Sequence, residues 1–334
     1  MTVRIRKFRP SDALRPFVRF YYTVESADTS PFPIQNHPQG GVDLVLAFHG
    51  DTLFRSDAHI LPPSSGEGPA LAAGSLGGEL SGLRVRESAT HASAYPGPAE
   101  GGMSRLSGLF ILPLQEHPFQ TTFLSAVDHV AVSLHPEGAH RLLRVDIGAS
   151  INSGRALDRS DDGELHELFL RLRALARPSA PCAEERPETV TRLDRFFCRR
   201  LETWDAHSPR FHYATKEIRR SRGRIAIPDL ADTVAASPRS LQRWSRTAFG
   251  LTPKRYAMIV RFHSTVRLLR RCPPERWLDA ALGLGYYDQS HFIAEFKRFS
   301  GQSPAQFFAT EQRVSEFYSG RRVDLELTRP AIRR

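Results

Sequence analysis

Residues 237–253 of this chain read SPRSLQRWSRTAFGLTP, and residues 288–304 read DQSHFIAEFKRFSGQSP. The two stretches end alike, because Gly-x-Thr-Pro closes the first and Gly-x-Ser-Pro closes the second at an offset of 51 residues. An apolar residue recurs at the same offset, as Leu241 and then as Phe292. Self-similarity at a fixed offset predicts two copies of one supersecondary unit.

The first copy carries the signals of a helix-turn-helix. A positioning helix is predicted over Pro228–Val234 and a second helix over Arg239–Ala248. Ser237 is the predicted N-cap, and Pro238 suits the first helical position because no hydrogen bond is lost there. Arg and Gln side chains can form paired hydrogen bonds with guanine and adenine edges in the major groove. The predicted DNA contacts of this unit are Arg239, Ser240, Gln242, Arg243 and Arg246.

The second copy follows the same plan, with a positioning helix over Leu278–Leu284, a turn at Gly285 and a cap at Asp288. Its first turn is expected to face the bases, as recognition helices usually do. Basic residues further along are expected to contact phosphates, which position a protein without reading sequence. Phe292, Phe296 and Phe299 form the predicted buried stripe. The predicted DNA contacts are Gln289, Ser290, His291, Lys297 and Arg298.

Positive charge is concentrated around these units. Residues 211–310 contain 17 Lys and Arg against 7 Asp and Glu, whereas residues 1–210 contain 23 against 25. A basic module beside a nearly neutral one predicts binding to a polyanion. The stretch Arg219–Arg224 is interpreted either as a phosphate clamp or as a solvated helix end. Trp244 and Trp277 are expected in the core, because proteins that bind duplex DNA rarely stack bases on aromatic rings.

Together with the two helical units, the first half of the chain predicts an α+β protein. A β-rich domain, which is a candidate cupin-like fold, precedes the all-α double helix-turn-helix. Strands are expected at Phe17–Val24 and Val42–Phe48, and a strand pair at Phe119–Leu124 and Val127–Leu134. Residues 64–82 are rich in Gly and Ser and predict a loop. Further helices are expected at Pro136–Arg144, Asp161–Ala176 and Thr189–Trp204.

The predicted domains follow from these patterns. Residues 1–177 form a β-rich regulatory, sensor or dimerisation domain, and 178–210 form a linker and a connecting helix, with the proline-rich stretch 177–188 as the best linker candidate. Residues 211–310 form the DNA-binding domain, and 311–334 form a charged tail that is expected to fray.

Composition excludes several classes of protein. The longest apolar run, Val42–Phe48, is far shorter than the ~20 residues of a membrane span, and no apolar segment follows the basic N-terminus. The three cysteines are far apart and form no Cys-x-x-Cys, which argues against a disulfide framework or a cysteine zinc site. We therefore expect a cytoplasmic protein that binds no membrane and needs no cofactor.

Two enzyme hypotheses are weaker than DNA binding. A metal-dependent cupin needs a His-x-His pair, which this chain lacks, so surface or loop positions are the default interpretation of His37, His49, His117, His129, His135 and His140. A DNA-repair alkyl-transfer protein needs clustered cysteines or a Pro-Cys-His-type nucleophile, whereas Cys182 is in the linker and Cys198 is on a predicted helix face. The chain is expected not to be an enzyme. The alternative function is a small-molecule-binding or metal-dependent cupin-like protein in which DNA binding is secondary.

The two units together resemble the DNA-binding domain of the AraC/XylS family of transcriptional regulators. The resemblance implies that Pro253–Arg271 is a long helix joining the units, which would dock in successive major grooves. This sequence departs from the family at Ser245, where a Phe is usual, and at Ala294, where a longer polar side chain is common. The matching residues are Leu230-Ala231, Ser237-Pro238-Arg239-x-Leu241-x-Arg243, Gly250-x-Thr252-Pro253, Ala281, Gly285-Tyr286, Asp288-Gln289-Ser290-His291-Phe292 and Gly301-x-Ser303-Pro304.

The first half is similar, more loosely, to the sensor-like domain of a subset of these regulators. The similarity rests on an expected strand at Leu14–Val18, on Gly40–Val45 and on Val132–Ala139. The resemblance implies a sequence-specific regulator that binds double-stranded DNA. An unknown small-molecule effector, a second copy of the chain in a homodimer and RNA polymerase are further candidate partners.

Overall fold

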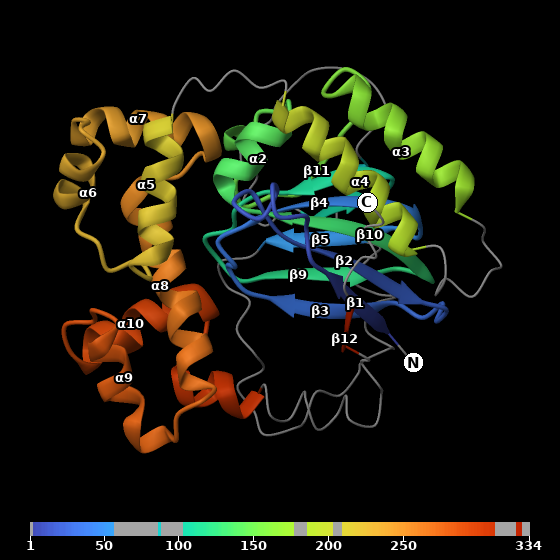
Figure 1. Cartoon of the computed structure of the whole chain (residues 1–334). Helices are drawn as coiled ribbons and strands as arrows, with labels where there is room; N and C mark the ends of the chain where they lie inside the picture. The colour runs from blue at the N-terminus through green and yellow to red at the C-terminus, as the bar shows by residue number, and fades with distance from the viewer. Residues whose placement is uncertain are drawn as a thin grey trace.

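The computed structural model describes residues 3–56, 86–87, 103–176, 186–202, 209–310 and 325–328. Strands dominate the amino-terminal part of this chain, and helices make up the carboxyl-terminal part (Figure 1). The Gly/Ser-rich loop predicted at 64–82 and residues 177–185 of the predicted linker lie outside the described residues.

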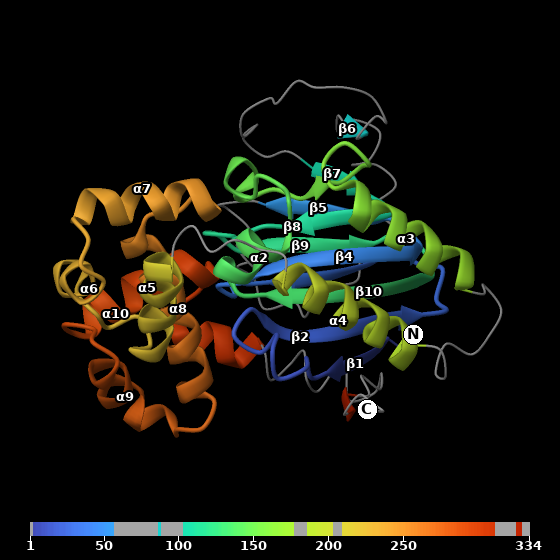
Figure 2. The same ribbon diagram turned by 45° about the horizontal axis from the view of Figure 1, so that its top comes forward.

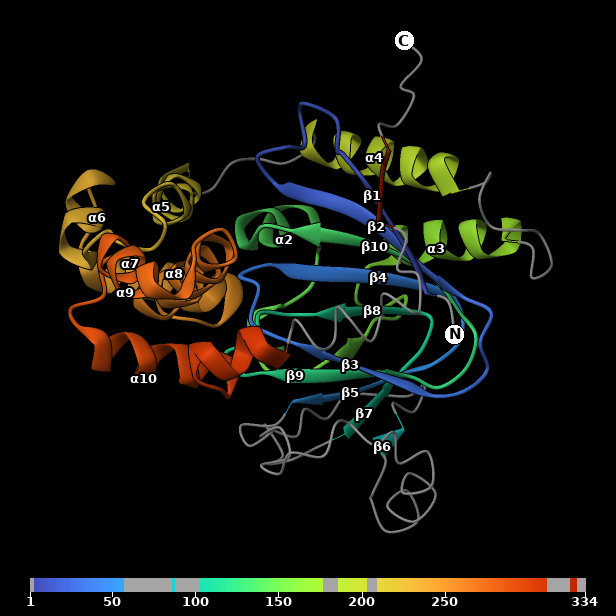
Figure 3. The same cartoon turned by 90° about the horizontal axis from the view of Figure 1, so that it is seen from below.

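Two β-sheets face each other in the amino-terminal part (Figure 3). The larger sheet contains, in spatial order, β11 (Arg155–Ala156), β8 (Leu109–Leu112), β4 (Val42–His49), β10 (Val127–Leu134), β2 (Val18–Ser26), β1 (Arg4–Phe8) and β12 (Leu325–Thr328). The smaller sheet contains β3 (Phe32–Asn36), β9 (Phe119–Phe123), β5 (Thr52–Ser56), β7 (Met103–Leu106) and β6 (Arg86–Glu87). Pairing is antiparallel except between β1 and β12 and between β6 and β7.

Three local expectations about this part are wrong. The strands β9 and β10 are not a pair, because each lies between two other strands of a different sheet. Residues 12–17 form turns, with the N–H of Arg15 donating to Ser11 O and that of Val18 to Leu14 O, so the strand begins only at Val18. The tail does not fray throughout, because Leu325–Thr328 pairs in parallel with β1.

Helices cover the outer face of the larger sheet (Figure 2). They are α2 (Pro136–Leu142), α3 (Gly163–Leu175) and α4 (Arg186–Glu202), while the short η1 (Gly148–Ser150) lies against the helical part of the chain. The sequence pattern assigns α4 to a connecting region, but Leu193 and Phe197 of this helix are fully buried. Its Arg200 also donates to Asp162 Oδ2 at 2.6 Å. The helix therefore packs as part of the amino-terminal domain.

The carboxyl-terminal part is entirely helical over residues 209–310 apart from its turns. It contains α5 (Pro209–Arg220), α6 (Ile227–Thr233), α7 (Pro238–Phe249), α8 (Pro253–Leu269), η2 (Pro274–Arg276), α9 (Trp277–Gly283), α10 (Gln289–Ser300) and helical residues 304–310. The long α8 lies between the pair α6–α7 and the pair α9–α10 (Figure 1). In the described part of the chain, no helix has the length and apolarity to cross a membrane.

Candidate nucleic-acid interface

The helix α7 begins and ends as its sequence predicts. The Ser237 hydroxyl accepts a hydrogen bond from the Ser240 N–H at 3.1 Å, which satisfies one of the free amides of the first turn. Gly250 ends the helix with φ 77°, and its N–H donates to Arg246 O at 2.8 Å. Leu241, Ala248 and Phe249 are buried beneath the helix. Its outer face exposes Arg239, Gln242, Arg243 and Arg246, while Ser240 is half-buried.

The position at which the first unit departs from the family pattern, Ser245, lies in the core. Ser245 is 2% exposed and therefore faces inward, where the family usually has a Phe. Trp244 beside it is half-buried and packs against the same apolar core, as expected for a core tryptophan. Neither Ser245 nor Trp244 is among the exposed residues of α7.

The helix α10 repeats this arrangement. The Asp288 carboxylate accepts from the His291 N–H at 2.8 Å, and Gly301 closes the helix with φ 76°. The predicted stripe of Phe292, Phe296 and Phe299 is confirmed as buried. The exposed residues of this helix include Gln289, Ser290, Lys297 and Arg298.

His291 differs from the other predicted contacts because both of its ring nitrogens have neighbours within the unit. Nδ1 accepts a hydrogen bond from the Tyr287 N–H at 3.1 Å. Nε2 lies 3.6 Å from Glu295 Oε2. The ring is half-buried. Through its two contacts, the side chain links Tyr287, just before α10, to Glu295 within the helix.

A buried ion pair fixes α10 to α8. The Arg261 Nε donates to Glu295 Oε1 at 2.9 Å, and both side chains are almost completely buried. The guanidinium also lies over the Tyr286 ring at 4.8 Å, and the Thr265 hydroxyl donates to the Tyr286 hydroxyl at 3.2 Å. Of these residues, the sequence patterns had singled out Tyr286 but not Arg261, Thr265 or Glu295. The one available signal was a charge at a helix position that faces inward.

The stretch Arg219–Arg224 is not a phosphate clamp as a whole. Arg219 forms an ion pair with Glu137 of α2, and Glu137 is 2% exposed. Arg220 pairs with Glu217 at 2.8 Å, and Arg224 donates to Gly283 O at 3.3 Å. The solvated-helix-end interpretation is also incomplete, because Arg219 joins the helical part to the β-rich part.

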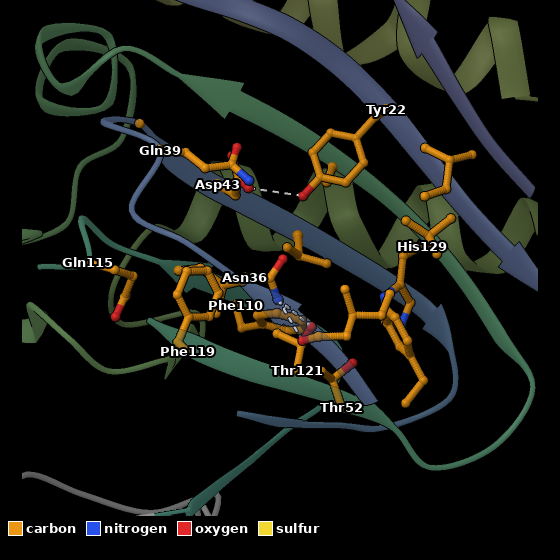
Figure 4. Close-up of a pocket in the computed structure, with 18 of the residues that line it drawn as sticks. Tyr22, Asn36, Gln39, Asp43, Thr52, Phe110, Gln115, Phe119, Thr121 and His129 are labelled. Atoms are coloured by element: carbon orange, nitrogen blue, oxygen red, sulfur yellow. Dashed lines mark hydrogen bonds between the residues drawn. The ribbon is translucent and has the colours of Figure 1, made fainter. Parts of the chain in front are cut away.

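A cavity of about 260 Å³ lies between the two sheets. Side chains from both sheets point into it (Figure 4). Tyr22 donates to Asp43 at 3.0 Å from one sheet, and Asn36 donates to Thr121 at 2.9 Å in the other. Aromatic residues including Phe110, Phe119 and Phe123 supply much of the remaining wall.

Burial shifts the pKa values of ionisable groups around this cavity. It raises the pKa of the Asp43 carboxyl, and together with Asp43 it raises the pKa of the Tyr22 hydroxyl well above its usual value. Burial and the nearby Arg19 lower the pKa of Lys7. Thr52 Oγ1 and Gln115 Oε1, from two residues that line the cavity, have no hydrogen-bond partner among the described residues.

The six histidines weighed as metal ligands do not assemble into a site in the described ranges. No group of three or more His, Cys, Asp or Glu side chains there could hold a metal ion. Three of these histidines are partly or fully buried. Burial lowers the pKa of His37 to about 4 and that of His135 to about 2, in each case with help from nearby arginines. His129 is 3% exposed and lines the cavity.

Comparison with known proteins finds two family models. Residues 230–310 match a family described as a helix-turn-helix domain. Residues 6–154 match a domain of unknown function, DUF6597. In sequence, no curated protein matches this chain.

Among solved structures, the chain is similar to ToxT from Vibrio cholerae. One ToxT structure is 9% identical, with 86% of this chain and 97% of that chain covered and a TM-score of 0.39. ToxT with a bound unsaturated fatty acid is 10% identical over 85% and 92% of the two chains, with a TM-score of 0.37. The AraC-like transcriptional activator CuxR is 10% identical over 79% and 80%, with a TM-score of 0.27.

Two helix-turn-helix units with matching caps, matching buried faces and exposed basic side chains define a DNA-binding protein. The helix-turn-helix family model covers both units. The chain carries a helix-turn-helix domain over residues 230–310 and a domain of the DUF6597 type over residues 6–154.

Proposed function

We propose that this regulator reads DNA with the exposed faces of α7 and α10, which would lie in successive major grooves. The observation that carries the proposal is the division of each helix into a buried apolar side and an exposed polar side. In α7 that polar side carries three arginines and a glutamine, which are the side chains best suited to guanine and adenine edges. In α10 the exposed Gln289 and Ser290 are at the amino-terminal turn that usually meets the bases.

The remaining cations would supply affinity rather than sequence discrimination. Lys297 and Arg298 are exposed in the last turn of α10, where they would neutralise phosphates and release counterions. His291 would contribute less to base contacts than its neighbours, because its ring already holds the start of the helix.

We further propose that a small molecule bound between the sheets modulates DNA binding. The cavity combines aromatic walls with a few convergent polar groups, as ligand sites usually do. Thr52 Oγ1 and Gln115 Oε1 have no hydrogen-bond partner among the described residues, so each could accept a hydrogen bond from a polar group of the ligand. The ligand expected from these walls is a compact, largely apolar molecule with at least one hydrogen-bond donor.

Two loops connect this cavity to α8. The loop before β4 lines the cavity with Gln39 and Gly41, while a Cβ placed on Gly40 would lie 3.5 Å from Ile259 Cγ2 of α8. The loop after β8 lines the cavity with Gln115, and the next residue, Glu116, pairs with Arg255 of α8 at 3.3 Å. Because α8 joins the two units, movement of either loop would change how the recognition helices are presented.

The DNA-binding proposal is tested with sites selected from a random duplex library by the purified protein. Selective binding that survives about 150 mM salt is expected, since base contacts add to the salt-sensitive phosphate contribution. Equal, salt-labile binding to selected and random DNA would refute it. A matched pair, Gln242→Ala in α7 and Gln35→Ala at an exposed position of β3, separates base contacts from general surface effects.

The effector proposal has its own experiment. Ala131 is buried on β10 and lines the cavity, so Ala131→Leu would fill part of the space without adding a polar group. A compound library is screened for thermal stabilisation of both proteins. Compounds that stabilise the wild type but not Ala131→Leu are expected, and stabilisation of both proteins alike would place binding elsewhere. The homodimer and the RNA polymerase contact stay predictions from the sequence.

A further inference from the structure

One residue next to the second recognition helix is unusually exposed. Tyr287 directly precedes the cap of α10 and is 88% exposed, whereas its neighbour Tyr286 is 3% exposed. Leu175, the next most exposed large apolar side chain in the described part of the chain, is 53% exposed. Single exposed apolar side chains are common on protein surfaces, but Tyr287 stands directly before the first turn of a recognition helix.

The backbone at Tyr287 is held from both sides. Its N–H donates to His291 Nδ1 at 3.1 Å, and the following residue, Asp288, caps the helix by accepting from the His291 N–H at 2.8 Å. The preceding residue, Tyr286, is anchored in the core against Arg261. The backbone from which the Tyr287 side chain projects is therefore already held in place before a partner binds, so only the side chain itself has to be ordered.

The repeat offset shows how the two units differ. Moving 51 residues along the chain, Gln242 and Arg243 of α7 correspond to Ile293 and Ala294 of α10. The middle of the second recognition helix has therefore lost two long polar side chains. Just before the helix starts, the second unit has the larger side chain, because Tyr287 corresponds to Ala236 of the first unit.

We propose that Tyr287 contacts DNA, donating its phenol hydroxyl to a phosphate beside the second half-site. The inference rests on the proposed function, because it requires α10 to lie in a major groove. Tyrosine is among the side chains that bond phosphates and so set the register of a protein on DNA. A contact at the start of α10 supplies anchorage that the apolar middle of the helix does not.

The test uses the full chain with Tyr287→Ala and Tyr287→Phe on selected and random duplexes over a salt series. Loss of one hydrogen bond predicts about three- to tenfold weaker binding for both variants, and on both duplexes, because a phosphate contact carries no sequence information. The slope of log K against log salt should stay unchanged, because a neutral side chain releases no counterion. Lys297→Ala is the contrasting variant and should reduce the slope by about 0.9.

A matched tyrosine control is Tyr213→Ala, at a residue that is 47% exposed on α5 outside the two units. It should bind DNA as the wild type does, and the melting temperatures of all these variants should match. If the wild type binds selected DNA and Tyr287→Ala binds within twofold of it, the inference is overturned while the proposed function stands. If Tyr287→Phe binds normally and only Tyr287→Ala is weak, the phosphate hydrogen bond is overturned. A wild type without selective binding would refute the proposed function itself.

Discussion

The ion pair between Glu137 and Arg219 makes the sharpest prediction about how the two parts of the chain hold together. Glu137 is on α2, which covers the β-rich part, and is 2% exposed. Arg219 is in the last turn of α5, and its side chain is 22% exposed. The change Glu137→Ala would leave the guanidinium at this interface without its carboxylate. Removing one partner of a buried ion pair costs about 3–5 kcal/mol, and the residual exposure of Arg219 argues for about 3 kcal/mol.

The measurement is the free energy of unfolding in urea for the wild type and for Glu137→Ala. The matched control is Glu188→Ala on α4, because Glu188 pairs with Arg192 at 2.6 Å but both side chains are exposed. An exposed pair of this kind contributes less than about 1 kcal/mol. The double variant Glu137→Ala/Arg219→Met should regain part of the loss, because it removes the uncompensated charge as well.

Similar losses for Glu137→Ala and Glu188→Ala would refute the reasoning, because burial would then have no effect on the value of the pair. Failure of the double variant to recover any stability would show that the shape of the interface, rather than the unpaired charge, is responsible.

Three further predictions follow from the same geometry. Arg243→Ala should lose about 1–3 kcal/mol of discrimination at one base pair, measured as the ratio of affinities for selected and mismatched duplexes, and equal weakening on both would contradict a base contact. Gly301→Val places a branched side chain at φ 76°, so it should destabilise the second unit by about 1–3 kcal/mol, and unchanged melting and DNA affinity would contradict it. Burial, with Arg270 nearby, lowers the pKa of His37 from 6.5 to about 4, so the unfolded chain takes up this proton first. Stability should therefore fall between about pH 6.5 and 4, by about 3 kcal/mol from this group, and His37→Gln should flatten that part of the profile.

Local signals predicted the helical half of the chain well, and there is a physical reason. Caps such as Ser237 and Asp288 and stops such as Gly250 and Gly301 act within one helical turn, so short stretches of sequence are enough to specify them. The Phe stripe of α10 is likewise a pattern of period close to 3.6 that one helix imposes on its own sequence. The family model over residues 230–310 is in agreement with the two units read from these patterns.

The β-rich half was less predictable, because strand pairing depends on residues that are distant in sequence. The strands β9 and β10 are only a few residues apart, yet they lie in opposite sheets. The segments Leu14–Val18 and Val132–Ala139 carried the sequence similarity, and the structure packs them together. A Cβ on Gly138 would come within 2.1 Å of Phe17 O, so only glycine fits there.

By itself, the sequence determined the double helix-turn-helix, its caps and most of the side chains that its recognition helices expose. The tertiary structure alone decided which charges are buried in pairs, because Arg219 and Glu137 are 82 residues apart and Arg261 and Glu295 are 34 apart. It also decided that Tyr22, Asp43 and Thr121, from three separate strands, line one cavity. Capping and amphipathicity are local free energies, whereas ion pairs, cavities and sheet order arise only when distant segments of the chain meet.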